Sequence, residues 1–324
     1  MKKIIVLSLT LTLSWFIIGC NSSTEPKNSN VSDIEALIQA EDSLFTIDGF
    51  TDAQSDSFQF QYGQHHRGQF HGPFLPWFVR RSVESWNRNI DVQTMSEDSA
   101  IVTITMEMAG TFHIGINADT TNDTRVDTIW EKPFDVTAIR KVSVVRRQFP
   151  TWMARHMGRR HNGWRIAGMT PLVSESATSD LTIGSFIIRD VTSGESLEID
   201  DPLATFLNWQ NMPQFNAGDS IEVEMTVSNG DNSGTTVLAQ YRMAPRFGRM
   251  FTRLFDDGNA PDITADDGTF TGGWTMARMP GMRQSVFEVL DNTLLTDPDA
   301  EYSAVIWSLP YLVRMRHMGG GMGM

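Results

Sequence analysis

Oxygen-bearing side chains are crowded into one stretch of twelve residues, where they could bind a metal ion. The stretch contains five aspartates and one asparagine, at Asp256, Asp257, Asn259, Asp262, Asp266 and Asp267. Ca²⁺ takes about six to eight hard oxygen ligands, and one loop often supplies many of them. We therefore expect a structural Ca²⁺ ion as a cofactor, with these ligands: Asp257, Asn259, Asp262, Asp266 and Asp267.

The spacing of these carboxylates leaves a second interpretation open. No Asp-x-Asp-x-Asp-Gly run with a glutamate at the twelfth position is present, so the stretch is not an EF-hand. Asp257-Gly258 and Asp267-Gly268 are typical of tight turns in which a carboxylate accepts hydrogen bonds from backbone N–H groups. The same aspartates can therefore be metal ligands or turn-forming residues.

A basic stretch is the second candidate site. No acidic residue lies between Asp135 and Glu175, whereas eight basic residues do. Arginine binds phosphate and carboxylate through paired hydrogen bonds. We predict an anion-binding tip at Arg155, Arg159 and Arg160 that contacts lipid phosphate or another anionic envelope polymer. The alternative is a solvated loop that pairs with acidic residues elsewhere.

Methionine and histidine could bind copper, and histidine could also act in catalysis. Met153, His156 and Met157 share one face if their segment is helical, and thioethers with imidazoles suit Cu(I), although methionine is also a common core filler. No G-x-S-x-G, H-E-x-x-H, Walker A or C-x-x-C pattern is present. His113 and Asp135 could face a pocket, but a histidine on an alternating strand is more often structural.

The N-terminal leader has the three zones of a secretory signal. Lys2 and Lys3 precede an apolar run of 15 residues, which is shorter than the roughly 20 residues that a membrane-spanning helix needs. Residues 17–20 (Ile-Ile-Gly-Cys) resemble the bacterial lipobox. The resemblance implies a diacylglyceryl group on Cys20, cleavage before it, and acylation of the new amino terminus, for example with palmitate. The alternative is an uncleaved anchor.

Two further features of the leader and the cysteine content bear on location. Residue 21 is asparagine rather than aspartate, so the inner-membrane retention signal is absent and an outer-membrane location is expected. Cys20 is the only cysteine, and its acylation excludes a disulfide. The exported part must therefore be stabilised by its own core.

Charge and composition narrow the function further. The chain has a formal net charge of −13, and residues 180–313 alone hold 20 acidic residues against 7 arginines. This acidity argues against nucleic acid as a partner. An apolar content of 40% is enough for folded cores.

Local patterns predict helices followed by strands in the first half of the chain. A helix is expected from Ser32 to about Phe45, with Glu35 completing a capping box, and a second short helix over residues 76–85. Strands are expected over residues 91–95, 100–116, 129–149 and 164–170. Residues 98–103 and 162–166 carry the soft local signs of a family resemblance. The order is similar to the cystatin-like cone of the nuclear transport factor 2-like superfamily, which includes small hydrolases, isomerases and binding modules.

The second half of the chain has short strand candidates separated by Gly, Asp, Asn and Pro. They cover residues 181–191, 220–228, 236–243, 251–255, 269–276 and 283–290. The acidic stretch resembles a turn of bacterial extracellular immunoglobulin-like modules. The resemblances together imply an α+β cystatin-like cone followed by an all-β immunoglobulin-like sandwich.

The predicted organisation and function follow from these patterns. The parts are a lipoprotein signal peptide (1–19), a flexible tether (20–30), a cystatin-like α+β domain (31–175), an immunoglobulin-like β-sandwich (180–313) and a Met/Gly-rich tail (314–324). The leading hypothesis is a lipid-anchored cell-envelope binding protein without catalytic activity, whose partners are the membrane and an anionic polymer or another envelope protein. The alternatives are a small envelope hydrolase or isomerase that uses a cone pocket, and a copper- or calcium-handling lipoprotein.

Overall fold

The computed structural model describes most of the chain after residue 28. The described residues are 29–45, 57–59, 75–117, 126–147, 160–230, 234–244 and 247–315. The leader, Cys20, Arg155 and Arg159 lie outside these residues, and of Arg160 only the backbone is described. Among the described helices, none has the length and apolar character needed to cross a membrane.

Antiparallel strands dominate the structure and form two sheets. The larger sheet has the order β1-β2-β3-β4-β6-β15-β14-β11-β12, with β5 paired to β4 and β9 paired in parallel to β15. Its strands are β1 (Ser57–Gln59), β2 (Leu75–Ser96), β3 (Ser99–Asn117), β4 (Thr128–Arg146), β5 (Trp164–Met169), β6 (Leu172–Ser176), β9 (Gln214–Asn216), β11 (Thr235–Ala244), β12 (Phe247–Leu254), β14 (Gly281–Asp291) and β15 (Ala304–Arg314).

The smaller sheet has four strands in the order β13-β10-β7-β8. They are β7 (Leu181–Asp190), β8 (Ser196–Ile199), β10 (Ser220–Asn229) and β13 (Thr269–Thr275). The described helical elements are α1 (Ser29–Ala40), the 3₁₀ turns η1 (Asp42–Leu44) and η3 (Arg160–Gly163), and α3 (Asn292–Thr296).

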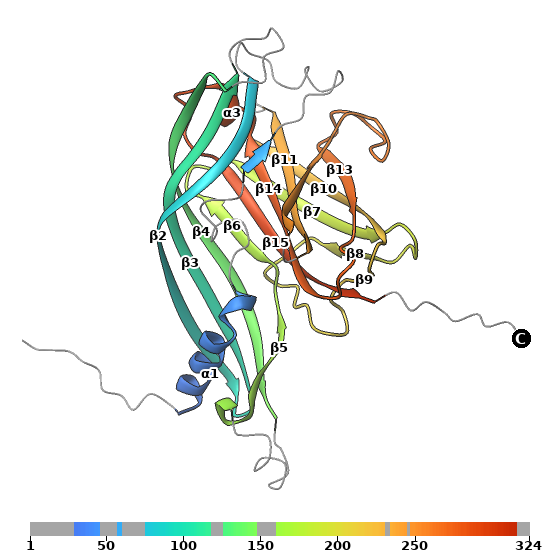
Figure 1. Cartoon of the computed structure of the whole chain (residues 1–324). Helices are drawn as coiled ribbons and strands as arrows, with labels where there is room; N and C mark the ends of the chain where they lie inside the picture. Colours follow the sequence, from blue (N-terminus) through green and yellow to red (C-terminus); the bar gives the residue numbers. More distant parts are fainter. Residues whose placement is uncertain are drawn as a thin grey trace, which may run out of the picture.

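The long strands β2, β3 and β4 bend together and hold α1 against one face (Figure 1). Along β3, buried and partly exposed residues alternate, as expected for a strand with one face in the core. The helix buries Ile34, Leu37 and Ile38 in that core, together with Phe45 after η1. The spacing of these four residues matches one face of a helix followed by a turn.

Strand β15 connects the two halves of the molecule. Ala304 and Ile306 belong to the core beneath α1, whereas Val305 and Trp307 belong to the core between the two sheets. In Figure 1, the four-stranded sheet lies on the other side of the large sheet from α1. β15 is therefore buried on both faces, and its two sets of side chains serve two separate cores.

The expected α+β cystatin-like cone followed by an immunoglobulin-like sandwich is wrong. Residues 76–85 are part of β2 and do not form a helix. Val79 and Arg81 face the core side while Arg80 and Ser82 face outward, and the aromatic and β-branched residues of this segment favour a strand. Among the described elements, α1 is the longest helix, and it has only 12 residues.

The sequence patterns also did not predict β15, which is an interior strand of the large sheet. Its run Ala-Val-Ile-Trp-Ser-Leu-Pro-Tyr-Leu-Val-Arg has no alternation because both faces are buried, and Pro310 argues against a central strand. β15 pairs with β14 on one side and with β6 on the other. Strands that come before residues 177–180 in the sequence and strands that come after them therefore belong to the same large sheet.

Candidate functional site

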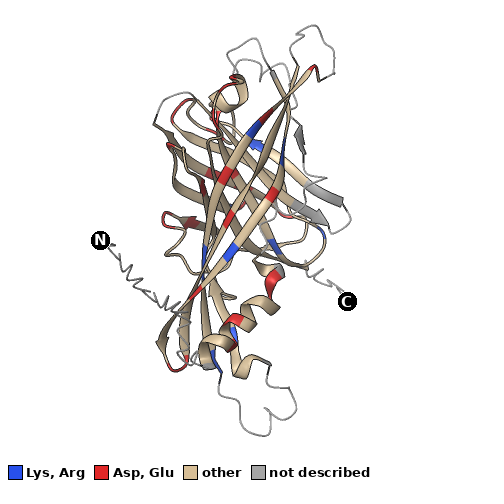
Figure 2. Cartoon of the chain, turned by 90° about the vertical axis from the view of Figure 1, so that its left-hand side faces the viewer, with Lys and Arg blue, Asp and Glu red and all other residues tan. Residues whose placement is uncertain are grey.

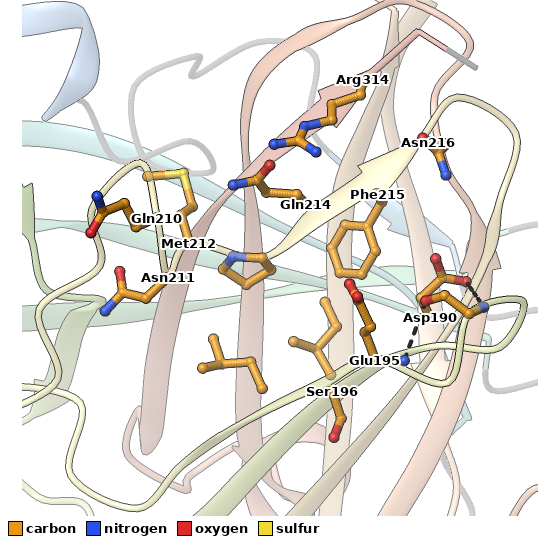
Figure 3. Close-up of a pocket in the computed structure, with 14 residues that line it drawn as sticks. Asp190, Glu195, Ser196, Gln210, Asn211, Met212, Gln214, Phe215, Asn216 and Arg314 are labelled. Atoms are coloured by element: carbon orange, nitrogen blue, oxygen red, sulfur yellow. Dashed lines mark hydrogen bonds between the residues drawn. The ribbon is translucent and has the colours of Figure 1, made fainter. Parts of the chain in front are cut away.

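An open groove of about 750 Å³ lies where the edges of the two sheets meet, and we call it the edge groove. Its walls are the β7–β8 turn, the loop that leads into β9, and the end of β15 (Figure 3). Its lining residues are Ile188, Asp190, Ser193, Glu195, Ser196, Leu197, Gln210, Asn211, Met212, Pro213, Gln214, Phe215, Asn216 and Arg314. The volume is within the range of about 300–1,000 Å³ that is usual for ligand sites.

Asparagine side chains build the loop that forms one wall. Asn208 Oδ1 accepts hydrogen bonds from the backbone N–H groups of Gln210 (2.8 Å) and Asn211 (3.2 Å). Asn211 Oδ1 in turn accepts from the N–H of Asn208 at 2.6 Å. These bonds close a turn that places Met212 and Phe215 in the core between the sheets. The loop is therefore held by its own side chains.

The opposite wall is the turn between β7 and β8. The carboxylate of Asp190 accepts hydrogen bonds from the N–H groups of Thr192 (2.7 Å) and Ser193 (3.3 Å). Gly194 has a φ of 76°, a conformation that favours glycine. Asp190 is thus used by the turn itself, whereas Glu195 and Ser196 are exposed along the groove.

Several polar side chains of the edge groove have no hydrogen-bond partner among the described residues. Glu195, Gln210 and Arg314 are exposed, and the Oε1 atom of Gln214 is buried and unpartnered while its Nε2 donates to the carbonyl of Trp209 at 2.9 Å. Figure 3 shows Phe215 between Arg314 and Glu195. The groove therefore combines amides and both signs of charge above an apolar floor.

An exposed aromatic residue lies next to these amides. Trp209 is 63% exposed and directly precedes Gln210 in the chain. Burying a large aromatic surface is favourable. Trp209 therefore offers an exposed apolar surface next in the chain to Gln210, which lines the edge groove.

The acidic stretch forms a compact loop between β12 and β13. Carboxylate oxygens of Asp256, Asp262 and Asp267 all lie within 4.8 Å of one another, and we call these three residues the acidic cluster. Asp262 and Asp267 belong to the ligand set predicted from the sequence, and Asp256 joins them. Among the predicted aspartate ligands, Asp257 and Asp266 are not part of this group.

The same carboxylates accept backbone hydrogen bonds, as the turn interpretation predicts. Asp256 accepts from the N–H groups of Asp267 (3.2 Å) and Gly268 (2.9 Å), and Asp262 accepts from those of Gly258 (2.5 Å) and Thr264 (3.2 Å). Each carboxylate oxygen has two lone pairs, so these bonds leave room for a cation. The metal and turn interpretations are therefore compatible.

Burial and backbone contacts move the pKa values of two of these carboxyls in opposite directions. Burial raises the pKa of Asp256, the charges of Asp267 and Asp262 add to this, and two N–H groups oppose it. For Asp262, burial also acts upward, but several backbone N–H groups together outweigh it and lower the pKa. A divalent cation would relieve the charge repulsion at Asp256.

The remaining predicted residues are placed as follows. His113 lies between Ser82 and Glu131 on the outer face of the long strands. Asp135 lines a separate groove of about 840 Å³ with Glu107 and Glu175. The arginine tip, apart from the Arg160 backbone, and the copper candidates at residues 153–157 lie outside the described residues.

The sequence patterns did not point to the edge groove. Its one local signal is residues 208–216 (Asn-Trp-Gln-Asn-Met-Pro-Gln-Phe-Asn), in which amides surround a tryptophan. The other wall and Arg314 come from distant parts of the chain, and only the fold brings them together. In comparisons with known proteins, no protein-family model and no curated protein matches this chain.

Proposed function

We propose that the protein is a lipid-anchored component of the cell envelope that binds a polar polysaccharide in the edge groove. The anchor is the acylated Cys20 implied by the lipobox-like leader. The observation that carries the binding role is the set of unpartnered Glu195, Gln210 and Arg314 side chains around one groove.

Amide and ring groups suit a carbohydrate better than a purely apolar ligand. A carboxamide both donates and accepts hydrogen bonds, as a sugar hydroxyl does. The C–H face of a sugar ring can lie on the exposed ring of Trp209, since aromatic faces carry negative charge. Arg314 can pair with a uronic acid carboxylate through its guanidinium. These features support an uncharged or acidic polysaccharide.

A peptide is the main competing occupant, because β8 is an edge strand of the smaller sheet. Peptide addition to an edge gains its affinity from backbone hydrogen bonds. β8 has only four residues, Ser196–Ile199, so it offers few of these bonds. The long amide-rich loop opposite β8 favours the polysaccharide.

Titration with a panel of purified neutral and uronic-acid-containing oligosaccharides tests the binding role. We expect saturable binding that weakens about tenfold or more in Trp209→Ala and Gln210→Ala, since losing about 1.4 kcal/mol changes Kd tenfold. Trp86→Ala is the matched control, because Trp86 is 64% exposed on β2. Absence of saturable binding, or equal losses in Trp86→Ala, contradicts the proposal.

Mass spectrometry of the N-terminal peptide from membranes tests the anchor separately. We expect a peptide that begins at Cys20 and carries acyl chains, and release of the Cys20→Ser variant from the membrane fraction. More than one chain is needed for stable attachment. An unmodified Cys20 peptide in the membrane fraction contradicts the lipid anchor.

A structural Ca²⁺ ion at the acidic cluster is a second proposal, supported by the 4.8 Å grouping of Asp256, Asp262 and Asp267. Hard oxygen ligands in one loop are the donor set that Ca²⁺ prefers. We expect the melting temperature to rise with Ca²⁺ and to fall with chelator, and this response to disappear in Asp262→Ala or Asp267→Asn. A melting curve that is the same with Ca²⁺ and chelator contradicts the site.

A further inference from the structure

Three side chains on adjacent long strands form a Ser–His–Glu chain of contacts, and we call them the outer-face triad. Ser82 Oγ on β2 lies 3.0 Å from His113 Nε2 on β3, and His113 Nδ1 lies 3.4 Å from Glu131 Oε1 on β4. A serine nucleophile needs an imidazole nitrogen that accepts its proton. A carboxylate at the other nitrogen then orients the ring. His113 Nε2 thus faces the serine hydroxyl, and Nδ1 faces the carboxylate of Glu131, whose side chain is 66% exposed, at ion-pair distance.

The strand register explains why the three residues meet. His113 pairs directly with Glu131 on one side and with Arg80 on the other. Ser82 is two residues after Arg80, so it lies on the same face and diagonally opposite His113. Neighbouring Phe112 and Ile114 point into the core, and the triad is consequently on the face of the sheet away from α1.

We propose that the outer-face triad hydrolyses carboxylic esters. This activity goes beyond the binding role of the edge groove and does not depend on it. The triad includes His113, which the sequence alone marked only as a residue that could face a pocket.

The reaction balances with water as the only co-reactant. His113 Nε2 takes the proton of Ser82 as Oγ forms a bond to the ester carbonyl carbon, and Glu131 stabilises the imidazolium at Nδ1. The proton then passes from Nε2 to the leaving alkoxide as the C–O bond breaks. Water, deprotonated by His113, releases the acid and restores Ser82.

Neighbouring groups supply the other needs of the reaction. Arg80 is two residues before Ser82 on the same face, and its Nε is buried with no hydrogen-bond partner among the described residues. It is the cation placed by register to stabilise a developing oxyanion. Arg80 is therefore our candidate for the group that stabilises the negative charge on the carbonyl oxygen.

Apolar side chains lie on the same face, two residues further along the strands from Arg80 and His113. Gly115 pairs with Phe78 and Ile129, and a Cβ on Gly115 would lie 2.2 Å from the Phe78 ring. The ring therefore lies over the glycine, beside Ile129, which is 52% exposed. Phe78 is four residues before Ser82 on β2, roughly 13 Å away along an extended strand. These two side chains can therefore contact an extended alcohol part of an ester, but not a short acyl group bonded to Ser82.

Labelling with a fluorophosphonate probe and turnover of p-nitrophenyl acetate and butyrate test the activity in the mature chain with Cys20→Ser. We expect one covalent adduct, mapped to Ser82, and turnover that Ser82→Ala abolishes. His113→Gln should lower kcat about a hundredfold or more. Glu131→Gln should lower kcat with little change in KM.

The matched control is Ser185→Ala, since Ser185 is also on a sheet surface but pairs with Thr226 Oγ1 at 3.0 Å. Its turnover and labelling should equal those of the parent chain. Unchanged urea midpoints in all variants show that folding is intact. Turnover that survives in Ser82→Ala, an adduct on another residue, or no adduct and no turnover in the parent chain overturns the proposal.

Discussion

Arg81 on β2 pairs with Glu288 on β14, although four strands separate β2 from β14 in the sheet and 207 residues separate the two in sequence. Arg81 Nη1 donates to Glu288 Oε2 at 3.0 Å, and a second bond joins Nη2 to Oε1. The hydroxyl of Tyr302 accepts from Arg81 at 2.6 Å. The large sheet therefore curls until distant strands touch through their side chains.

Breaking this pair should destabilise the curled sheet strongly. Both side chains are largely buried, with 9% and 13% exposure. We expect Arg81→Met or Glu288→Gln to lower the free energy of unfolding by about 3–5 kcal/mol, because each leaves a buried charge without its partner. Urea unfolding of the mature chain measures this change. The double variant Arg81→Met/Glu288→Met should lose less than the sum, and a strictly additive loss would show that the pair does not couple.

Buried Arg140 should be less important alone than together with Gln284. Arg140 is 1% exposed, and burial lowers its pKa to about 10. Both Arg140 Nη1 (3.0 Å) and Gln284 Nε2 (2.9 Å) donate to the carbonyl of Leu44, which ends η1. We expect Arg140→Met to cost about 1 kcal/mol or less, since removing a desolvated cation offsets the lost bonds.

The double variant Arg140→Met/Gln284→Met removes both donors from the Leu44 carbonyl. It should lose about 1–3 kcal/mol more than the sum of the single variants, which is the usual cost of an unsatisfied polar group. Faster amide exchange in η1 should accompany the loss. If the stability losses of the two single variants simply add up in the double variant, the Leu44 carbonyl does not need either donor.

Lys132 should be required for the turn after α3. Its Nζ donates to the carbonyls of Asp297 (2.6 Å), Pro298 (3.2 Å) and Ala300 (2.6 Å). Lys132→Met keeps the apolar stem but leaves these acceptors without a donor, and we expect a loss of about 1–3 kcal/mol. Hydrogen exchange should quicken in residues 292–300. The partly exposed Lys141 provides a control, and Lys141→Met should change stability much less.

The opposite pKa shifts in the acidic cluster predict its pH dependence. Asp262 has a lowered pKa, so the folded state binds fewer protons than the unfolded state. Its contribution to stability is present above the unfolded pKa of about 3.9 and is lost as pH falls through the lowered folded value. Asp256 has a raised pKa and contributes in the opposite sense, gaining stability as pH falls.

Thermal melts between pH 2 and pH 7 measure these contributions. Asp262→Asn should lower the melting temperature at pH 7. The difference in melting temperature between this variant and the parent chain should become smaller in acid. The increase in melting temperature with Ca²⁺ should also shrink as pH falls towards about 4, because protons compete for the ligands. A Ca²⁺ effect that grows in acid would exclude these carboxylates as ligands.

Part of the fold could be predicted because local periodicity reported it directly. β3 and β10 have one core face each, and their alternation identified them as strands. β15 is buried on both faces and carries Pro310, so it has no such signal. The helix expected over residues 76–85 is wrong, because the aromatic and β-branched residues of this segment favour a strand, which pairs with β3.

The candidate sites differ in the same way. The acidic cluster is local in sequence, so its chemistry was visible before the fold was known. The edge groove joins Glu195, Gln210 and Arg314 from three elements, and the outer-face triad joins residues of β2, β3 and β4. Contacts between distant residues depend on sheet order and register, which one sequence does not reveal.

The acidic and basic residues also form no single-sign stripe on the face in Figure 2. Acidic and basic positions are interspersed along the long strands there. The formal charge of −13 is therefore not concentrated on this face.

Hydrogen–deuterium exchange with the tightest-binding oligosaccharide of the panel tests the binding role most directly. We predict slower amide exchange in residues 193–197 and 209–216, which form the two walls of the edge groove, and clearly less slowing in Trp209→Ala at the same oligosaccharide concentration. Saturable binding that leaves these segments unchanged, and slows exchange elsewhere, would contradict the account.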